Sequence, residues 1–527
     1  MKILVLEGVT ERGRALLEAE GWQLDLRKAL PPKEIVPLVG DCDAILVRSG
    51  SRITSEVIEA APRLRVIGRP GVGVDNVDIE AATRRGVMVM NSPHGNLVST
   101  AELTFALLLA TARPIARADA SMKAGVWDRK SFSGVELHGK RLGVVGFGRI
   151  GREVAARARA FGMDVVAFDP YVAASLAETL HVRLAPLDEL LAGCDFLTLH
   201  TTLNKDSRHL IGARALSLVK PGVRIVNAAR GELIDSEALL QALESGRVAA
   251  AALDVHAQEP PVDWRLAQHP RVLATPHIGA ATDEAQERVG TDIAQQVRDF
   301  LKGGVIQQAV NFFALSPDLY DRVRLAMDVA ERLGSFLAQL GDGPLERVEL
   351  GLYGELRELD PQPILSAALA GALRPSTTGQ VTVVNAPTLA RERGIEVLET
   401  TSSARVAFAN LMAMRVRTSE TSLSAAATLF GGSHVRLVDL DGVELDAIPR
   451  GHLLLVRNDD TPGVVGHVGS VLGRHSVNIA RMSLGRKPDS GRAVMLIEID
   501  QEAPPELLGE VAALGGVREA RAVTLGA

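Results

Sequence analysis

Residues 143–151 read GVVGFGRIG, and this stretch decides the fold of the region around it. Gly146, Gly148 and Gly151 form the pattern G-x-G-x-x-G directly after an apolar run and directly before a helix-like run, REVAARARAFG. In such a unit the first glycine makes a tight turn, the second lets a pyrophosphate approach the backbone, and the third lets helix and strand pack closely. The pattern therefore predicts a dinucleotide site between a strand and a helix.

An acidic residue in the next part of the chain indicates which dinucleotide is bound. The next apolar run ends at Asp169, 18 residues after Gly151. A carboxylate at this position accepts hydrogen bonds from both ribose hydroxyls and repels a 2′-phosphate. We therefore expect NAD rather than NADP. A glycine-rich turn without a ligand is the alternative, and the flanking strand, helix and acid disfavour it.

Short Val/Ile/Leu runs on both sides of this stretch follow the rhythm of parallel sheets. They are KILVLEG, DAILVRSG, LRVIGRPG and VMVMNSP, and then RLGVVGFG, MDVVAFDP, CDFLTLHT, VRIVNAAR, AAALDVH and RVLATPH. Helix-like segments separate these runs, so we expect two α/β units, each built on a parallel sheet. Residues 101–125 are expected to form one or two helices that leave the first unit, and residues 283–302 a helix that returns to it.

The composition changes after about residue 312. Residues 313–450 predict an α+β unit, with strands such as RVELGLYG and QVTVVNAP and a hairpin in GGSHVRLVDLDG. From Gly451 the order is strand, helix, strand, strand, helix, strand, which is ferredoxin-like. The predicted domains are residues 1–92 together with 279–312, then 93–278, 313–450 and 451–527.

Length and composition narrow the class of protein. The 527 residues exceed what one hydrophobic core supports, and 46% hydrophobic residues, 23% charged residues and a net charge of -6 are typical of folded proteins. No apolar run reaches the roughly 18 residues of a membrane helix. Cys42 and Cys194 are expected to be buried core residues rather than a disulfide framework. We expect a cytoplasmic protein with no nucleic-acid partner, membrane partner or metal site.

Three polar residues at successive strand ends are candidates for the chemistry that NAD serves. Hydride transfer to NAD requires that the substrate oxygen lose a proton, and histidine is suited to take it. His277 in TPHIGA is the candidate base, and Glu259 in DVHAQEPP the carboxylate that orients it. Arg230 in VNAARGELID presents a guanidinium that binds a carboxylate bidentately. Each has an ordinary structural interpretation alone, but their shared position behind a dinucleotide loop favours an active site.

These contexts resemble those of the D-isomer-specific 2-hydroxyacid dehydrogenases over about residues 1–312. The resemblance implies that Arg230, Glu259 and His277 are catalytic, and that a Rossmann-like NAD domain is inserted in a flavodoxin-like substrate domain. GRPGVGVDNVD, residues 68–78, and the following NSPHGNLVSTAELT resemble the branch that acts on 3-phospho-D-glycerate. This implies NAD-dependent oxidation to 3-phosphohydroxypyruvate, the first step of phosphorylated L-serine biosynthesis.

A phosphorylated acid needs more cationic groups than an unphosphorylated one. Arg48 in LVRSGS and Arg69 in IGRPG follow apolar strands of the first unit, and we expect them to bind the phosphate. Arg129 in WDRKSF resembles a residue that reaches a neighbouring subunit's site in family members.

The resemblance also implies cofactor contacts at the remaining strand ends. The backbone N–H groups of Arg149 and Ile150 would face the pyrophosphate, Thr201 and Ala228 would line the nucleotide slot, and Asp254 would accept a hydrogen bond from the carboxamide.

The final unit resembles an ACT domain, an amino-acid-binding module, through RNDDTPGVVGHVGSVLGRHSVNIARMSL. Residues 313–450 resemble the intervening domain of long family members. ACT domains form a ligand pocket at a subunit interface, and the matching positions are Asn458, Asp460 and Asn478. The resemblance implies L-serine as effector and a homotetramer. The alternative is a dimerisation module without a ligand.

Two other functions stay open at this point. One is a dehydrogenase for another 2-hydroxy acid, such as 2-hydroxyglutarate or glyoxylate. The other is a non-enzymatic NAD-sensing scaffold of the same fold, which would bind NADH without turning over a hydroxy acid.

Overall fold

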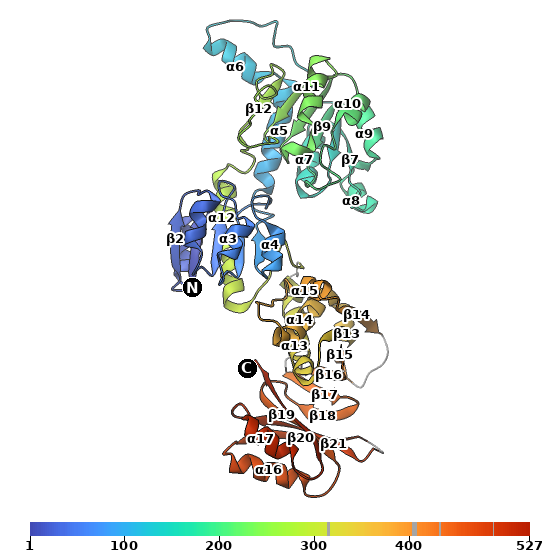
Figure 1. Ribbon diagram of the computed structural model, residues 1–527. Helices are drawn as coiled ribbons and strands as arrows, with labels where there is room; N and C mark the ends of the chain where they lie inside the picture. Colours follow the sequence, from blue (N-terminus) through green and yellow to red (C-terminus); the bar gives the residue numbers. More distant parts are fainter. Residues whose placement is uncertain (314–316, 403–407, 432–433, 488–489, 527) are drawn as a thin grey trace.

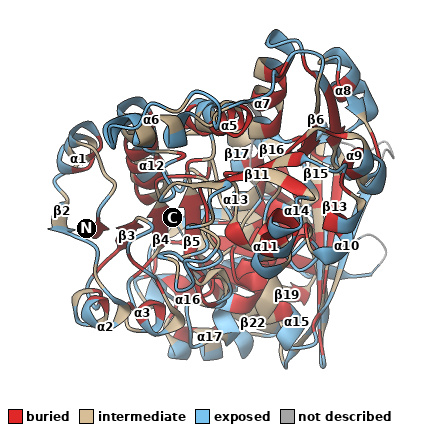
Figure 2. Cartoon of the chain, turned by 90° about the horizontal axis from the view of Figure 1, so that it is seen from above, coloured by how far each residue is buried: buried red, intermediate tan, exposed pale blue. Residues whose placement is uncertain are grey.

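The computed structural model describes residues 1–526 except 314–316, 403–407, 432–433 and 488–489. Its strands form four sheets, which follow one another along the chain and which we call the first to the fourth sheet (Figure 1). Buried residues concentrate in the strands and in the helix faces that cover them (Figure 2). The predicted α/β class, with two parallel sheets followed by an α+β unit and a ferredoxin-like unit, is confirmed.

The first sheet is parallel, with the order β2-β1-β3-β4-β5. Four of its strands are the predicted apolar runs, which are buried on both faces and therefore show no polar alternation. The sequence pattern does not predict β2, because QLDLR is an exposed edge strand that carries charged residues. The elements are β1 (Lys2–Leu6), α1 (Glu11–Glu18), β2 (Gln23–Arg27), α2 (Pro32–Ile35), β3 (Ala44–Val47), α3 (Ser55–Glu59), β4 (Val66–Arg69), α4 (Ile79–Arg84) and β5 (Met88–Asn91).

The second sheet is also parallel, with the order β12-β11-β10-β9-β6-β7-β8. The six predicted runs form six of its strands, and the seventh, β8, is a two-residue edge strand that is too short to leave a pattern. The elements are α5 (Leu97–Ala112), α6 (Ile115–Lys123), β6 (Arg141–Val145), α7 (Arg149–Ala160), β7 (Asp164–Phe168), α8 (Ala174–Thr179), β8 (Arg183–Leu184), α9 (Leu187–Gly193), β9 (Phe196–Leu199), α10 (Ala213–Leu218), β10 (Val223–Asn227), α11 (Ser236–Glu244), β11 (Val248–Leu253) and β12 (Val272–Ala274).

A long helix leads from the second sheet back to the first. α12 (Asp283–Gly303) buries Ile293 and Val297 against Ile3 and Val66 of the first sheet. Thr282 begins this helix, because its side-chain oxygen accepts a hydrogen bond from the backbone N–H of Ala285. The domain boundaries expected from the sequence stay a prediction.

The third sheet has the order β14-β13-β15-β16-β17-β18 and is covered by α13 and α14. Of the stretch predicted as a hairpin, residues 431–442, residues 432–433 lie outside the described residues, and the rest forms β17 and the turn to β18, which pairs antiparallel with β17. The elements are α13 (Pro317–Leu340), β13 (Leu345–Gly354), α14 (Pro361–Leu373), α15 (Ala386–Glu392), β14 (Glu396–Ser402), β15 (Asn410–Thr418), β16 (Ser422–Phe430), β17 (His434–Leu440) and β18 (Val443–Ala447).

The prediction of a strand in QVTVVNAP, residues 380–387, is wrong. This segment is a turn that leads into α15, and it docks on the first sheet's unit. The Thr382 hydroxyl donates to the Gly86 carbonyl at 3.1 Å and the Asn385 amide to the Arg84 carbonyl at 3.2 Å. Val384 is buried in the core beside β5. The run is apolar because it packs between two units, and it pairs with no strand in the described part of the chain.

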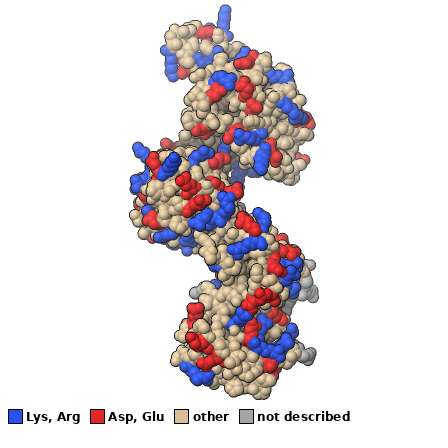
Figure 3. Space-filling model, in the orientation of Figure 1, with Lys and Arg blue, Asp and Glu red and all other residues tan. Residues whose placement is uncertain are grey.

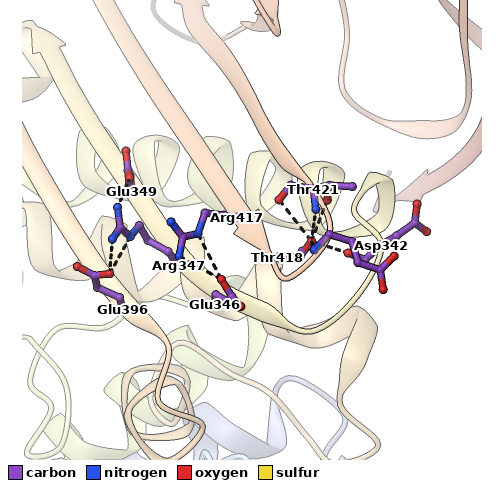
Figure 4. A network of polar contacts seen from close by, with 9 residues as sticks. Asp342, Glu346, Arg347, Glu349, Glu396, Arg417, Thr418 and Thr421 are labelled. Carbon is purple, nitrogen blue, oxygen red and sulfur yellow. Dashed lines mark hydrogen bonds and ion pairs between the residues drawn. The ribbon is translucent and has the colours of Figure 1, made fainter.

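Charged side chains pair across the third sheet, as Figure 4 shows. Arg347 contacts Glu396 at 2.6 Å and Arg417 contacts Glu346 at 3.1 Å. The hydroxyl of Thr418 accepts from the backbone N–H of Thr421 at 2.9 Å and so fixes the turn after β15. Exposed ion pairs of this kind contribute little free energy of folding, so the stability of this unit comes from its apolar core.

The fourth sheet is antiparallel, with the order β20-β21-β19-β22. Two helices cover one of its faces, and the other face packs on α13 through residues such as Leu453 and Val523. Arg521 donates to Asp342 at 2.9 Å and adds a polar contact to the third sheet's unit. The elements are β19 (Gly451–Asp459), α16 (Val464–Arg474), β20 (Ile479–Lys487), β21 (Arg492–Ile499), α17 (Pro505–Ala512) and β22 (Val517–Leu525).

Buried thiols and mixed surface charges characterise the described part of the chain. Within the described residues, no helix combines the length and the apolar composition needed to cross a membrane. Cys42 and Cys194 are buried free thiols, and burial raises the pKa of Cys194 to about 12. On the face seen in Figure 3, basic and acidic side chains are interspersed.

Candidate active site

The glycine loop joins the end of β6 to the start of α7. Gly146 has a φ of +92°, which residues with side chains rarely adopt, and a Cβ there would lie 2.6 Å from the carbonyl carbon of His200. A Cβ at Gly151 would lie 2.2 Å from the Gly146 carbonyl oxygen. Among the described atoms, none lies within 4 Å of a Cβ placed on Gly148. The loop is therefore closed on the protein side and open where a pyrophosphate would approach.

Asp169 directly follows β7, and its carboxylate is attached to the same loop. It accepts hydrogen bonds from the backbone N–H of Phe147 at 2.8 Å and of Tyr171 at 2.9 Å. These bonds fix both carboxylate oxygens and leave lone pairs on each for ribose hydroxyls. The open loop and the fixed acid together fit a dinucleotide without a 2′-phosphate.

The other predicted cofactor contacts surround this loop. Arg149 and Ile150 are the first residues of α7, where backbone N–H groups have no partner within the helix. Thr201 lies just after β9, and its backbone nitrogen would lie 2.7 Å from a Cβ placed on Gly146. Ala228 follows β10. Because β6, β9 and β10 are adjacent and parallel, their carboxyl ends lie at the same edge of the sheet. The individual contacts stay predictions.

The predicted base and its orienting carboxylate are in contact. The Nδ1 atom of His277 lies 2.6 Å from an oxygen of Glu259, and the second oxygen of Glu259 accepts from the backbone N–H of His256 at 3.1 Å. Partial burial raises the pKa of Glu259, but the hydrogen bond and charge of His277 outweigh it, and the pKa ends below its usual value. The His277 side chain is 44% exposed, so a substrate can reach it.

Asp254 holds the loop that carries His277. It is fully buried, and its carboxylate accepts from the Thr275 hydroxyl at 2.6 Å and from the backbone N–H groups of Ile278 and Gly279 at 2.8 and 2.9 Å. This clamp maintains the positive φ of +54° at His277, a strained conformation for a residue with a side chain. The predicted hydrogen bond from Asp254 to the carboxamide stays a prediction, and the structure adds the loop-holding contacts to it.

Arginines from both parallel sheets gather at one place. Arg48 and Arg69 lie at the carboxyl ends of β3 and β4, and Arg230 follows β10 and forms an ion pair with Asp75 at 2.8 Å. Burial lowers the pKa of Arg69 to about 10, and the positive charges of Arg230 and Arg48 add to this effect, whereas Asp75 opposes it. The Nε atom of Arg69 is buried and has no hydrogen-bond partner in the described part of the chain. Such a cluster is arranged to bind an anion.

The arginine cluster and the histidine pair belong to adjoining loops. A Cβ at Gly231 would lie 2.0 Å from the carbonyl carbon of His256, so the loop after Arg230 lies directly against the loop that carries Glu259. Arg129 is not part of this assembly. It is exposed in the segment after α6, which projects at the top of the view in Figure 1.

Comparison with known proteins identifies the family. Residues 105–279 match the NAD binding domain of the D-isomer specific 2-hydroxyacid dehydrogenases, residues 322–441 the D-3-phosphoglycerate dehydrogenase intervening domain, and residues 452–516 the ACT domain. A D-3-phosphoglycerate dehydrogenase of Methanocaldococcus jannaschii is 40% identical over 526 residues, which is 100% of both chains. The chain belongs to the D-3-phosphoglycerate dehydrogenase family. A second member, from Synechocystis, is 39% identical and covers 99% of this chain and 95% of its own.

Solved structures of related dehydrogenases agree with this assignment. A glyoxylate reductase from Paecilomyes thermophila matches 59% of this chain and 98% of its own, with 33% identity and a TM-score of 0.55. A D-lactate dehydrogenase from Aquifex aeolicus, complexed with NAD and lactic acid, matches 60% of this chain and 100% of its own, with 27% identity and a TM-score of 0.55. The predicted class, an NAD-dependent dehydrogenase, and the predicted cofactor, NAD, are confirmed.

Asp75 is a site residue to which the sequence pattern assigned no role. It lies within the family-like stretch GRPGVGVDNVD, where Arg69 alone attracts attention as a cation at a strand end. An acid in a glycine-rich loop close behind that arginine is a local signal, but the partner of the acid, Arg230, is 155 positions away. Only the folded chain shows that the two meet.

The three predicted effector residues do not form one pocket within a single chain. Asn458 pairs with Ala493 on β21, whereas Ile479, next to Asn478, pairs with Ile499 at the other end of that strand. Six strand residues correspond to about 20 Å. Asn458 is buried, and its side-chain oxygen has no hydrogen-bond partner in the described part of the chain. Asp460 pairs with Arg486, and Asn478 donates to Asp500 at 2.8 Å.

Replacement of Asp169 by asparagine tests the cofactor choice. We expect KM for NAD to rise about 10- to 100-fold, because a hydrogen bond to a charged group contributes about 1.5–3 kcal/mol, and the preference for NAD over NADP to narrow. The matched control is Asp164→Asn at the opposite end of β7, whose carboxylate pairs with Arg141 at 2.7 Å on the surface. Steady-state kinetics with both cofactors measure the effect, and an unchanged KM for NAD in Asp169→Asn would contradict the assignment.

Proposed function

We propose that this protein oxidises the 2-hydroxyl group of 3-phospho-D-glycerate with NAD and forms 3-phosphohydroxypyruvate, the first step of phosphorylated L-serine biosynthesis. The observation that carries the substrate is the cluster of Arg48, Arg69 and Arg230 around one carboxylate, Asp75. Three positive charges and one negative charge give the cluster a net positive charge, which suits a substrate with both a phosphate and a carboxylate. The relatives that match the whole chain carry the corresponding name.

The residues around the substrate have different roles in the reaction. NAD supplies the hydride acceptor. As the hydride leaves C2, the hydroxyl oxygen of the substrate loses its proton to His277, and the C2–O bond becomes a carbonyl. Glu259 orients the imidazole through their 2.6 Å contact and stabilises its charged form. Asp254 keeps the His277 loop in place through the hydrogen bonds described above.

The arginines orient the substrate for this proton transfer. Arg230 binds the carboxylate next to C2, because the loop that follows it at Gly231 lies against the loop that carries Glu259. Arg48 and Arg69 bind the phosphate from the first sheet. An acid without a phosphate would leave the buried Nε atom of Arg69 without a partner, which disfavours lactate or glyoxylate as the substrate.

The test is NADH formation from 3-phospho-D-glycerate and NAD at alkaline pH, compared with 2-hydroxyglutarate, glycolate and D-lactate. We expect kcat/KM to be highest for the phosphorylated acid by at least tenfold. A higher value for an unphosphorylated acid would point to another 2-hydroxyacid dehydrogenase. Tight NADH binding with no turnover in either direction on any of these acids would point to an NAD-sensing scaffold.

L-serine is the proposed effector, and two chains form its site. Asn458 and Asp460 lie about 20 Å from Asn478 within one chain, so the three side chains surround one ligand only when fourth sheets from two chains are placed side by side. The buried Asn458 oxygen has no hydrogen-bond partner among the described residues, which suits a donor such as the serine ammonium. Millimolar L-serine is expected to inhibit turnover. Turnover that serine does not change would be consistent with the enzymatic function and would contradict the serine site.

We propose a homotetramer for the same protein, placed in the cytoplasm in keeping with its two free thiols. The segment from α6 onward exposes Ile115, Met122, Val126 and Trp127, the last to 75%. An exposed apolar segment of this kind is typical of a protein contact, which supports the proposal that Arg129 reaches a neighbouring chain. Light scattering is expected to show four times the 56.0 kDa of one chain. A monomer mass would contradict the proposal.

A further inference from the structure

The loop that carries Asp75 is fastened to the first sheet on both sides. The Asn91 amide donates to the Val72 carbonyl at 2.6 Å. The Asn76 amide donates to the carbonyls of Arg48 and Ser51 at 2.9 and 2.8 Å. Asp75 therefore stands between two anchored residues, on the same frame that holds Arg48 and Arg69. The backbone on both sides of Asp75 is held by contacts within the first sheet's unit.

The carboxylate of Asp75 points away from the first sheet's unit and binds a residue of the second sheet's unit. It accepts from the Nε atom of Arg230 at 2.8 Å, while the NH1 atom of Arg230 donates to the Ala229 carbonyl at 2.7 Å. A Cβ at Gly73 would lie 1.7 Å from the NH2 atom of Arg230. The guanidinium is thus held through Nε and NH1, and its NH2 atom lies over a glycine, which leaves three of its five N–H groups without a partner among these contacts and able to donate to a ligand.

The charges show why this position needs a carboxylate. Arg48, Arg69 and Arg230 repel one another, and Asp75 is the negative charge that counteracts their effect on Arg69. Without it, Arg230 would swing away from the other two arginines. A carboxylate that is 63% exposed is also hydrated, so it binds Arg230 without the cost of a buried charge.

We propose that Asp75 is a positioning residue for the reaction: it aligns Arg230 with Arg48 and Arg69 across the two sheets, so that the carboxylate and the phosphate of one substrate molecule are bound in a single orientation. This inference rests on the proposed function. A structural ion pair between the two units would affect stability and not turnover, and a carboxylate that competes with substrate for Arg230 would affect KM and not kcat.

The test compares Asp75→Asn and Asp75→Glu with the wild-type full-length protein. Glu80→Gln is the matched control, because its carboxylate pairs with Arg84 at the same distance of 2.8 Å on the outer surface of α4. For each protein, kcat, KM for 3-phospho-D-glycerate, the dissociation constant of NADH and the melting temperature are measured.

We expect Asp75→Asn to lower kcat about 10- to 100-fold, with KM no higher than wild type, because the cluster becomes more positive while Arg230 loses its orientation. NADH affinity and melting temperature stay close to wild type, Asp75→Glu recovers part of kcat, and Glu80→Gln changes nothing. Unchanged kcat, with or without a lower KM, overturns the inference. So does a loss of kcat that follows the melting temperature and is equal in both Asp75 variants.

The wild-type assay distinguishes a failure of the proposed function from a failure of the role proposed for Asp75. Wild-type protein without turnover of 3-phospho-D-glycerate or reduction of 3-phosphohydroxypyruvate refutes the proposed function and the inference with it. Active wild-type protein with a fully active Asp75→Asn variant refutes the role of Asp75 and leaves the function standing.

Discussion

His277→Asn is expected to lower kcat about 10³-fold and to leave the dissociation constant of NADH within about twofold of wild type. A positioned general base contributes about 10²- to 10⁴-fold to a rate, and asparagine keeps a hydrogen-bonding side chain but cannot take a proton. NADH binding is retained because the glycine loop and Asp169 follow β6 and β7, which at least three strands of the second sheet separate from β12, the strand before His277. Stopped-flow or steady-state measurement of NADH formation gives kcat, and NADH fluorescence gives the affinity.

The control for this variant is a second histidine–glutamate pair. His475 contacts Glu510 at 3.0 Å on the fourth sheet's unit, so His475→Asn removes the same type of contact outside the site. It is expected to retain wild-type kcat in the absence of effector. In the wild-type protein the hydrogen bond and charge of His277 outweigh burial and hold the pKa of Glu259 below its usual value, so the carboxylate that orients the histidine is charged. Substantial turnover by His277→Asn would mean that another group takes the proton.

Arg230→Met is expected to lower kcat/KM about 10²- to 10⁴-fold. Two hydrogen bonds between charged groups contribute about 3–6 kcal/mol to binding in the transition state, and methionine keeps the length of the stem but has no donor. The loss is expected in kcat as well as KM, since the carboxylate that Arg230 binds is attached to the reacting carbon. Initial rates over a range of 3-phospho-D-glycerate concentrations separate the two parameters.

A surface arginine of the same unit serves as the control. Arg183 pairs with Glu189 at 2.6 Å and is 54% exposed, so Arg183→Met removes a charge and an ion pair without touching the cluster. We expect no change in kcat/KM. If Arg230→Met retained more than a tenth of the wild-type kcat/KM, the carboxylate of the substrate would have to bind elsewhere.

In the two parallel sheets the strands that the sequence predicts are buried apolar runs, apart from β12, a half-buried edge strand. An unbroken apolar run such as AILV, residues 44–47, is typical of a strand inside a parallel sheet, where both faces are covered. The two unpredicted strands of the parallel sheets, β2 and β8, lie at sheet edges, where exposed residues carry no distinct pattern. The wrong strand in residues 380–387 is apolar for another reason, namely the burial of Val384 against the first sheet's unit.

By itself the sequence determined the dinucleotide loop, its acid and the histidine pair as candidates, because each depends on a few neighbouring residues at a strand end. Gly146 and Asp169 are recognised from the strand, turn and helix around them. Only the tertiary structure decided what the cluster of arginines does. Asp75 and Arg230 are 155 positions apart and meet because two separately folded sheets present their carboxyl ends to one another. Asn458 and Asn478 are close in sequence, yet the pairing of β19, β20 and β21 holds them at opposite ends of one sheet.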